Sequence, residues 1–466
     1  MTETSPNEIS HVIKAATPLV EPTAKEAARV DAIARSVMDR VSAALGKRGL
    51  QAEAVLGGSY AKGTWLRGDA DIDIFVRLPT SMSRETLERL GRELGMDALR
   101  GNNPILRYSE HPYVEGIVEG VRVNVVVCYD VQKGQWLSAA DRSPFHTTYI
   151  AEKFNPALRR ETRLLKKLIK TVGVYGAEVK HEGFSGYVCE VLTLRYGGFE
   201  KTLRGIAELT EEEVISVVPY DKELVTGLRS TIKILDPVDP KRNLGAAISP
   251  QSVGRLVLAA RAFLKRPSLR FFKPIQRAGI EHIEDSPLLP YLAAVVFQHR
   301  MRTVDDLWGQ LKRSVRRIEM QLGKKGFHVL MARAASDEEN NSAFVFLLES
   351  LALPKFELRS GPKATMGGDT SRFLAKRRAD SLLTWVGDDL RSHTVILRPS
   401  PDLKRFLIEL ISRRLDASGV SRGLQPDLKK EARIITGRQV LKAAAKLGWL
   451  EAAVVSMLAG DPFLQG

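Results

Sequence analysis

The 466-residue chain is longer than one hydrophobic core usually serves, so we expect three or four packed units. With 44% hydrophobic and 27% charged residues it is not a disordered chain, and its two cysteines, Cys128 and Cys189, exclude a disulfide framework or a zinc cluster. The formal net charge of +15 favours a polyanionic partner such as RNA or DNA, although a solvated basic surface gives the same balance.

Nothing in the sequence indicates a membrane or an export route. The first ten residues, MTETSPNEIS, lack the basic and apolar regions of a signal peptide. No run of about 18 apolar residues follows elsewhere. We therefore expect no membrane partner and a cytoplasmic protein.

The first predicted helix begins after Pro22. Thr23 and Glu26 match a capping box, in which the Thr23 hydroxyl accepts from the first turn and Glu26 reaches back. Apolar residues then recur at helical spacing, up to a stop at Gly46 or Gly49: Val30, Ile33, Val37, Val41 and Leu45. Residues 54–56 predict a strand, and residues 84–94 predict a second helix with an apolar face of Leu87, Leu90 and Leu94.

The stretch from Gly57 to Val76, GGSYAKGTWLRGDADIDIFV, joins a glycine turn to an apolar strand with two acids. Because strand side chains alternate, Asp71 and Asp73 point to one side, roughly 6 to 7 Å apart at the backbone, while Ile72 and Ile74 face a core. Two such carboxylates repel unless a cation lies between them, and hard oxygens suit Mg²⁺. The turn can bring backbone N–H groups to phosphates. An edge strand with two solvated acids would also explain Asp-x-Asp alone.

The whole stretch carries a family resemblance. A glycine pair followed by Ser, a spacer of about a dozen residues and Asp-apolar-Asp-apolar is the signature of polymerase-beta-like nucleotidyltransferases. The run GSYAKGTWLRGDADIDIFV closely resembles the archaeal (class I) CCA-adding enzymes, which are tRNA nucleotidyltransferases. The resemblance is dense from about residue 55 to 275 and thin afterwards. It implies template-independent addition of CCA to tRNA 3′ ends from CTP and ATP, with two Mg²⁺ ions.

One position departs from that pattern. Residues 113–118 and 121–129 predict a hairpin closed by Glu119-Gly120, whose second strand lies beside Asp71 and Asp73. In the family this strand supplies a third carboxylate, but the aligned residue here is Asn124. Its carbonyl oxygen can still meet Mg²⁺, although it brings no charge and cannot act as a base near neutral pH. Asp130, roughly 20 Å further along the strand, is too far to replace it.

Asn124 leaves three explanations open. The chain is a working variant, a slow or nucleotide-binding-only protein, or a sequence altered to block turnover. Asp71, Asp73 and Asn124 are our expected catalytic and metal-binding residues.

A basic helix is predicted to start at Asn155-Pro156 and to stop at Gly173. Arg159, Arg163, Lys166 and Lys170 lie along one of its faces, as on many solvated helices. The family resemblance implies a nucleotide pocket around this helix, formed by Gly58, Ser59, Thr64, His111, His146, Lys166 and Tyr175. Lys is a fitting point charge for a phosphate, whereas Tyr175 is also a plausible packing residue and His146 a plausible structural one.

Without a template, protein and RNA groups must select cytosine or adenine, and this requires hydrogen-bond donors that reach the acceptor atoms of the base. Arg242 is our candidate, since Arg can donate to cytosine O2 and N3 or to adenine N1. It lies in the turn-rich connector at residues 236–243, which matches the family closely. A loop arginine in a surface salt bridge is the alternative.

The expected fold class is an α+β multidomain chain. We expect a nucleotidyltransferase head with a mixed sheet and helices at residues 1–150, a helical neck at 151–272, a small α+β body at 273–360 and a mainly helical, basic tail at 361–466. The body shows strand-like runs at 290–297 and 344–348 and a basic helix at 308–322. The tail carries basic clusters that suit RNA backbone contact, namely Lys404-Arg405, Arg413-Arg414, Lys429-Lys430 and residues 433–438. Partners are therefore tRNA, CTP and ATP, and we also expect a homodimer.

Two other functions stay open. Another nucleotidyltransferase, resembling poly(A) polymerase or oligoadenylate synthase, would extend unrelated RNA with ATP alone. An inactive nucleotide- and RNA-binding protein would bind tRNA in a salt-sensitive way and extend nothing.

Overall fold

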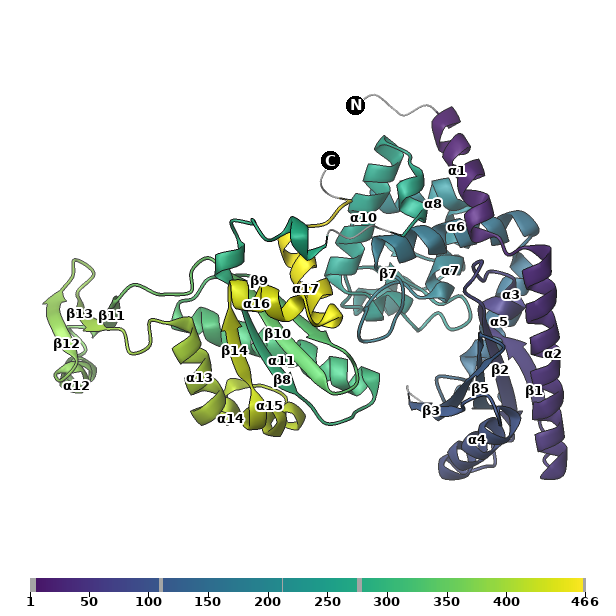
Figure 1. Ribbon diagram of the computed structural model, residues 1–466, viewed down its shortest axis with the longest axis horizontal. Helices are drawn as coiled ribbons and strands as arrows, with labels where there is room; N and C mark the ends of the chain where they lie inside the picture. The colour runs from purple at the N-terminus through teal and green to yellow at the C-terminus, as the bar shows by residue number, and fades with distance from the viewer. Residues whose placement is uncertain (1–5, 109–111, 212, 275–278, 464–466) are drawn as a thin grey trace. The chain divides into compact units, whose positions relative to one another are not determined.

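The chain folds into two compact units (Figure 1). The structure, a computed structural model, describes residues 6–108, 112–211, 213–274 and 279–463. Unit 1 consists of residues 1–276 together with 462–466, and unit 2 consists of residues 277–461. Within the described ranges, no helix combines the length and the apolar character that a membrane span requires.

A five-stranded mixed sheet forms the N-terminal part of unit 1. The strand order is β1 (Glu53–Gly57), β2 (Asp71–Leu78), β5 (Val121–Tyr129), β4 (Pro112–Val118) and β3 (Ile105–Tyr108). β2 and β5 run parallel, and the other neighbouring pairs run antiparallel. One face of this sheet is apolar and shares a core with α2 (Ala24–Lys47) and α4 (Arg84–Ala98). The other face is therefore left for the polar side chains of β2 and β5.

Helix α2 begins as predicted, because the Thr23 hydroxyl accepts a hydrogen bond from Glu26 N at 3.2 Å. The prediction that Glu26 reaches back to the cap is wrong. Its carboxylate accepts from Gly68 N at 2.6 Å, since the turn at residues 66–69 brings that amide within reach.

The predictions for α4 and for the hairpin are confirmed. Leu87, Leu90 and Leu94 are buried beneath α4. The hairpin between β4 and β5 closes at Glu119 and Gly120, both of which have positive φ, +49° and +80°. The alternation of β2 is confirmed as well, since its odd-numbered acids lie on one face and its isoleucines are fully buried on the other.

Helices make up most of the rest of unit 1. A second core is formed by α1 (Pro6–Val20), α6 (Pro156–Val172), α7 (Gly186–Tyr196), α8 (Phe199–Ala207) and α10 (Pro250–Lys265). Phe463 joins this core by stacking on Phe271, with ring centroids 5.0 Å apart. Helices α3 (Gly58–Lys62) and α5 (Arg142–Lys153) contact each other and β1. The shorter elements are β6 (Val214–Ile215), α9 (Lys222–Thr226), β7 (Lys233–Ile234), η1 (Leu244–Ala247) and η2 (Leu269–Phe272).

Helix α6 has the predicted ends. The Asn155 side chain accepts from Leu158 N at 2.8 Å, Pro156 occupies the first turn, and Gly173 ends the helix with φ +79°. Pro fits the first turn because its missing N–H has no partner there in any helix, and Gly tolerates the left-handed conformation.

Unit 2 is built on a four-stranded antiparallel sheet. The strand order is β14 (Arg433–Thr436), β8 (Leu292–Gln298), β10 (Asn341–Leu348) and β9 (Val329–Ser336). Helix α11 (Val304–Lys325) connects β8 to β9, and the helices α13 (Leu403–Arg413), α14 (Leu415–Ser418) and α15 (Gln425–Glu431) precede β14. This is the βαββαβ order of ferredoxin-like folds. The expected body strands and basic helix are confirmed.

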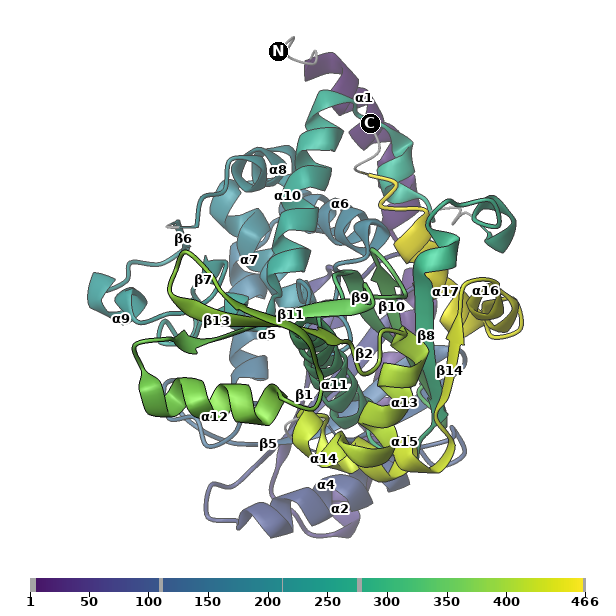
Figure 2. The same ribbon diagram turned by 90° about the vertical axis from the view of Figure 1, so that its left-hand side faces the viewer.

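Both faces of this sheet are covered. Val345 and Leu347 of β10 share a core with Val454 of α17 (Gly448–Leu458) and with α16 (Arg438–Ala444). Figure 2 draws α11 and α13 on the side of β8 that is opposite α16 and α17. Phe344 of β10 packs on Phe297 of β8, with ring centroids 5.1 Å apart. A strand covered on both faces has no solvent side, which is why residues 342–348 are all buried.

A second, smaller sheet is inserted between β10 and α13. Its order is β11 (Phe356–Lys363), β13 (Arg391–Leu397) and β12 (Ser381–Val386), with α12 (Gly367–Arg377) against β11. The region expected as a mainly helical tail therefore also contains strands, and residue 360 lies inside β11. Short 3-10 turns complete unit 2 at η3 (Ile280–His282), η4 (Leu289–Tyr291) and η5 (Arg422–Leu424).

Candidate active site

The outer face of β2 and β5 carries a polar row. Because these strands are parallel and in register, Asp71 lies beside Arg122 and Asp73 lies beside Asn124. The prediction that the strand of Asn124 lies beside Asp71 and Asp73 is therefore confirmed. Their side chains share the face opposite the core (Figure 1 shows the strand pair).

Asp73 and Asn124 form a direct pair. The Asn124 amide nitrogen donates to Asp73 Oδ1 at 2.9 Å. Its carbonyl oxygen is buried and has no hydrogen-bond partner among the described residues. Burial raises the pKa of the Asp73 carboxyl, while the Asn124 hydrogen bond and Lys62 oppose that rise. An unsatisfied buried oxygen beside a buried carboxylate is a donor set that a cation would complete.

Asp71 is more open and has a different neighbour. Its side chain is 39% exposed, and Arg122 Nη1 lies 3.5 Å from its Oδ2. Burial raises its pKa to about 6, and the nearby Asp73 adds to the rise while Arg122 opposes it. Asp71 thus loses its proton more reluctantly than an ordinary aspartate when no cation is present.

Glu115 is the acid that sequence reasoning missed. It lies directly across β4–β5 from Asn124, on the same face as the polar row. The signal was present in the alternation of β4, where Tyr113, Glu115 and Ile117 share a face. However, Arg107 Nη2 lies 2.9 Å from its Oε1, and Arg122 Nε lies 3.8 Å from its Oε2.

The donor set for a metal is therefore short of carboxylates. Among the described residues, no group of three or more His, Cys, Asp and Glu side chains is arranged to hold a metal ion. Asp130, at the far end of β5, pairs with Arg77. Asp71, Asp73 and the Asn124 carbonyl remain as oxygen donors, a chemistry that fits a hard divalent cation.

The glycine turn lies against Asp73. Gly58 has φ +64°, and a Cβ there would be only 1.8 Å from Asp73 Oδ2. Only glycine therefore fits between the turn and the carboxylate. Gly58 and Ser59 are the first two residues of α3, and Thr64 N donates a hydrogen bond to the Ser59 carbonyl at 2.9 Å.

Three of the expected basic residues of α6 hold the segment after this turn. Arg163 donates to the carbonyls of Gly63 at 2.7 Å and Trp65 at 3.0 Å. Lys170 pairs with Asp69. Lys166, 1% exposed, donates to Thr64 Oγ1 at 2.8 Å. The basic face of α6 is thus largely covered, which differs from the solvated face common for such stripes.

Lys166 belongs to a buried ionic cluster centred on Glu190 of α7. Lys166 Nζ lies 2.9 Å from Glu190 Oε1, and Lys62 Nζ lies 2.6 Å from Oε2. Burial alone would raise the pKa of Glu190, but Lys166 and Lys62 hold it lowered, at about 2. Burial also lowers the pKa of Lys166, against the effect of Glu190. Sequence reasoning missed Glu190, since an acid in an apolar helix carries no motif.

A second cluster joins the buried His146 and Asp236 to Arg242, whose side chain is 45% exposed. Both approach Asp236 Oδ2, His146 Nε2 at 2.8 Å and Arg242 Nη1 at 3.4 Å, while the Tyr187 hydroxyl donates to Oδ1 at 3.2 Å. The His146 ring stacks on Tyr187 with centroids 3.9 Å apart. Burial lowers the pKa of His146. Lys62 Nζ lies 5.3 Å from the centre of the Tyr187 ring and so links this cluster to the first.

Tyr175 completes the expected set near α6. Lys170 Nζ lies 5.0 Å from its ring centre, and burial raises its pKa well above the usual value. A Cβ on Gly186 would lie 2.8 Å from the Tyr175 hydroxyl, so this hydroxyl approaches the start of α7 closely. His111 lies outside the described residues.

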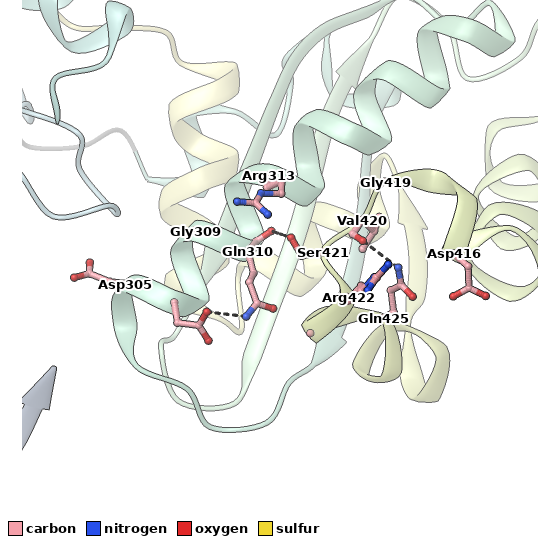
Figure 3. Close-up of a pocket in the computed structure, with 12 residues that line it drawn as sticks. Asp305, Gly309, Gln310, Arg313, Asp416, Gly419, Val420, Ser421, Arg422 and Gln425 are labelled. Carbon is pink, nitrogen blue, oxygen red and sulfur yellow. Dashed lines mark hydrogen bonds between the residues drawn. The ribbon is translucent and has the colours of Figure 1, made fainter. Parts of the chain in front are cut away.

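A separate pocket of about 670 Å³ lies in unit 2, between α11 and the segment 416–425 (Figure 3). It contains none of the sequence-predicted site residues. Its charged lining consists of three acids and two arginines, namely Asp305, Asp306, Asp416, Arg313 and Arg422. Gln310 Nε2 donates to Asp306 Oδ1 at 2.9 Å, and Gln425 Nε2 donates to Val420 O at 3.0 Å.

The chain matches three family descriptions in sequence order. Residues 38–150 match a nucleotidyltransferase domain, residues 160–273 match the second domain of tRNA nucleotidyltransferase, and residues 290–401 match the C-terminal domain of the CCA-adding enzyme.

Similar proteins are named CCA-adding enzyme. The one of Halobacterium salinarum is 37% identical over 362 residues, covering 76% of this chain and 78% of that protein. The one of Sulfurisphaera tokodaii is 34% identical, covering 85% and 89%. The one of Methanopyrus kandleri is 31% identical, covering 95% and 96%.

Proposed function

The chain belongs to the family of CCA-adding enzymes and is a tRNA nucleotidyltransferase, and we propose that its active centre is the row of Asp71, Asp73 and Asn124. In this role it adds C, C and A to tRNA 3′ ends from CTP and ATP without a template. The observation that carries the proposal is the parallel register of β2 and β5, which places Asp73 and Asn124 side by side.

The reaction is a nucleotidyl transfer. The 3′ hydroxyl oxygen of the tRNA forms a bond to the α-phosphorus of CTP or ATP. The bond between that phosphorus and the oxygen it shares with the β-phosphorus breaks. Pyrophosphate leaves, and the hydroxyl proton goes to an acceptor other than Asn124, because an amide takes no proton near neutral pH.

Nucleotidyltransferases use divalent metal ions, and we assign two Mg²⁺ ions to this site. Asp71 and Asp73 offer carboxylate oxygens, and the buried Asn124 carbonyl offers a third oxygen without charge. When bound, such ions neutralise the triphosphate and lower the pKa of the attacking hydroxyl. The local charge of the protein is one unit less negative than with three carboxylates, which favours a weaker hold on the metal.

Nucleotide binding is assigned to the residues around α3 and α6. Gly58, Ser59 and Thr64 come from the turn that packs on Asp73, and Lys166 meets Thr64 directly. Tyr175, His146 and His111 complete the proposed pocket. Arg242 is proposed to select the base, and the support is its 3.4 Å contact to Asp236, which also holds His146.

The proposal is tested by extension of tRNA that lacks its CCA end, with CTP, ATP and Mg²⁺. Asp71→Ala and Asp73→Ala should each abolish addition, because each removes a charged oxygen ligand. Asp130→Ala is the matched control, since this acid directly follows β5 but pairs with Arg77. Parental rates in either of the first two variants would refute the site. Extension of unrelated RNA with ATP alone would instead favour a poly(A)-polymerase-like activity.

We further propose four working parts: a catalytic head at 1–150, a nucleotide-pocket neck at 151–272, a body at 273–360 and a tRNA-binding tail at 361–466. The basic pairs of the tail, such as Arg413-Arg414, support the last assignment. The homodimer and the cytoplasmic location stay predictions. Light scattering of the purified chain measures the former.

A further inference from the structure

Glu190 is a fully buried carboxylate that receives three hydrogen bonds from three parts of unit 1. Lys62 Nζ of α3 donates to Oε2 at 2.6 Å. Thr64 Oγ1 donates to Oε1 at 2.5 Å, and Lys166 Nζ of α6 donates to Oε1 at 2.9 Å. One side chain of α7 thus joins the segment after the glycine turn to the basic helix.

One carboxylate is shared by two ammonium groups, so Glu190 balances only one of the two positive charges, in a place where Lys166 is 1% and Lys62 6% exposed. Lys62 also interacts with the Asp73 carboxyl, which belongs to the proposed metal site. A buried unpaired ammonium is costly, and removing one partner of a buried pair leaves the other charge uncompensated. Without the Glu190 carboxylate, Lys62 and Lys166 would repel each other across the Thr64 hydroxyl.

We propose that Glu190 is a positioning residue of the nucleotide site, which holds the ammonium groups of Lys62 and Lys166 beside Thr64 so that their remaining positive charge serves the triphosphate. This inference rests on the proposed function, because it takes the triphosphate to bind at Lys166. Glu190 itself, enclosed by its three donors, acts through the two lysines.

The other titratable groups around Lys166 stay neutral near physiological pH. Burial raises the pKa of Cys189 to about 12, and it raises the pKa values of Tyr175 and Tyr187 as well. Lys62 on α3 and Glu190 on α7 are the charged groups that face Lys166. Burial lowers the pKa of Lys166 and the Glu190 charge opposes this, so loss of that charge makes Lys166 neutral at a lower pH.

The test measures CTP and ATP affinity without tRNA, by calorimetry on the full chain with Mg²⁺, between about pH 6 and 9. Glu190→Gln should bind both nucleotides roughly tenfold more weakly at neutral pH, with a loss that deepens as pH rises, since each unit above a pKa changes the charged fraction tenfold. In the extension assay its KM for nucleotide should rise more than its kcat falls.

Two further variants separate charge from structure. Glu190→Asp keeps the charge on a shorter side chain, so its nucleotide affinity should fall less and stay flat with pH. Asp427→Asn is the matched control, because Asp427 is also buried between two cations, Arg300 and Arg302, but in unit 2. It should leave nucleotide affinity unchanged.

The outcomes are distinct. Parental affinity and a parental pH profile in Glu190→Gln would overturn the inference, and if that variant does not fold, parental affinity in Glu190→Asp would do the same. Lys166→Ala decides which proposal fails. If it weakens nucleotide binding while the Glu190 variants do not, the role of Glu190 alone is wrong. If it has no effect either, the proposed triphosphate site is wrong.

Discussion

Asn124 determines how much charge the active centre can offer. Its amide nitrogen satisfies Asp73, and its carbonyl oxygen is left buried beside that carboxylate. A carboxylate in its place would add a negative charge and a proton acceptor in the same position. That carboxylate and the Asp73 carboxylate would also repel each other, and only a cation between them would relieve the repulsion.

We predict that Asn124→Asp raises the rate of CCA addition by about two decades or more at saturating Mg²⁺, because it restores a charged ligand on the hydroxyl side. The assay is single-turnover extension of tRNA lacking CCA. Binding of Mn²⁺, followed by its electron paramagnetic resonance signal, should tighten in parallel. An unchanged rate would mean that the parent works through another arrangement, and Asn124 would then not be the third ligand.

Gly58 is the second residue on which the site depends. Gly58→Ala should reduce extension severely, since the new methyl would meet Asp73 Oδ2 at 1.8 Å and displace it. Gly68→Ala is the matched control, because Gly68 has a similar φ of +73° and a methyl added there would have nothing within 4 Å. In urea unfolding, Gly68→Ala should lose about 1 kcal/mol of stability from backbone strain, and Gly58→Ala should lose more because it also displaces Asp73. Equal activity in the two would show that Asp73 tolerates displacement.

The sequence predicted that Asp71 and Asp73 share a strand face and that Asn124 lies beside them, but it did not predict what surrounds them. Alternation along a strand places Asp71 and Asp73 on one face, and this needs no tertiary information. Whether Lys166 reaches solvent depends on the segment after the glycine turn lying over α6, which no local pattern reveals. Glu190 was missed for the same reason, because its three partners are 24, 126 and 128 residues away in the sequence.

At the scale of elements, α6 acts as a clamp on the segment between the glycine turn and β2. Its ends were predictable from Asn155, Pro156 and Gly173, since capping is local chemistry. Its tertiary role comes from side chains that reach backbone carbonyls. Arg163 is 15% exposed and satisfies the carbonyls of Gly63 and Trp65.

Arg163→Ala should therefore destabilise unit 1 by about 1.5 to 3 kcal/mol, because charged hydrogen bonds are lost and two carbonyls lose their donor. The measurement is chemical denaturation followed by tryptophan fluorescence, which reports on the adjacent Trp65. Arg160→Ala, at an exposed position of the same helix, should change stability by less than about 0.5 kcal/mol. Equal effects in both variants would contradict the clamp.

In the small sheet of unit 2, backbone pairing rather than side-chain contacts holds an element in place. Strand β12 is an edge strand with Leu382, Leu383 and Trp385 exposed by 54%, 60% and 39%. Residues 381–386 have the apolar and aromatic character of a strand, but the neighbouring basic clusters led to the expectation of a mainly helical tail. Its pairing with β13, rather than burial, fixes its conformation.

At the scale of the molecule, the charge of +15 should show as salt-sensitive RNA binding. We predict that the logarithm of the tRNA association constant falls linearly with the logarithm of salt concentration between about 50 and 200 mM. The variant Arg413→Ala with Arg414→Ala should lower the slope by roughly one for each phosphate contact removed. A slope equal to that of the parent would place the RNA elsewhere, and fluorescence anisotropy with labelled tRNA measures both.

The sheet of unit 2 marks the limit of prediction at this scale. The runs that became β8 and β10 were recognised, as was α11, since each is a local pattern. That β14 pairs with β8 was not, because Arg433 and Val296 are far apart in sequence and no short-range signal joins them. Helices α16 and α17 then close one face of the sheet. Any RNA contact of this unit must therefore use loops, edges or helices.

Because Phe463 packs in unit 1, the core of that unit is completed only at the end of synthesis. Unit 2 is inserted into unit 1, and the ring that stacks on Phe271 is made only after all of residues 277–461. The N-terminal part of unit 1 therefore emerges from the ribosome long before Phe463 can complete its core. A chain that lost only its final residues would keep every catalytic side chain and the whole of unit 2, yet it would carry an open gap in the core that supports Glu190.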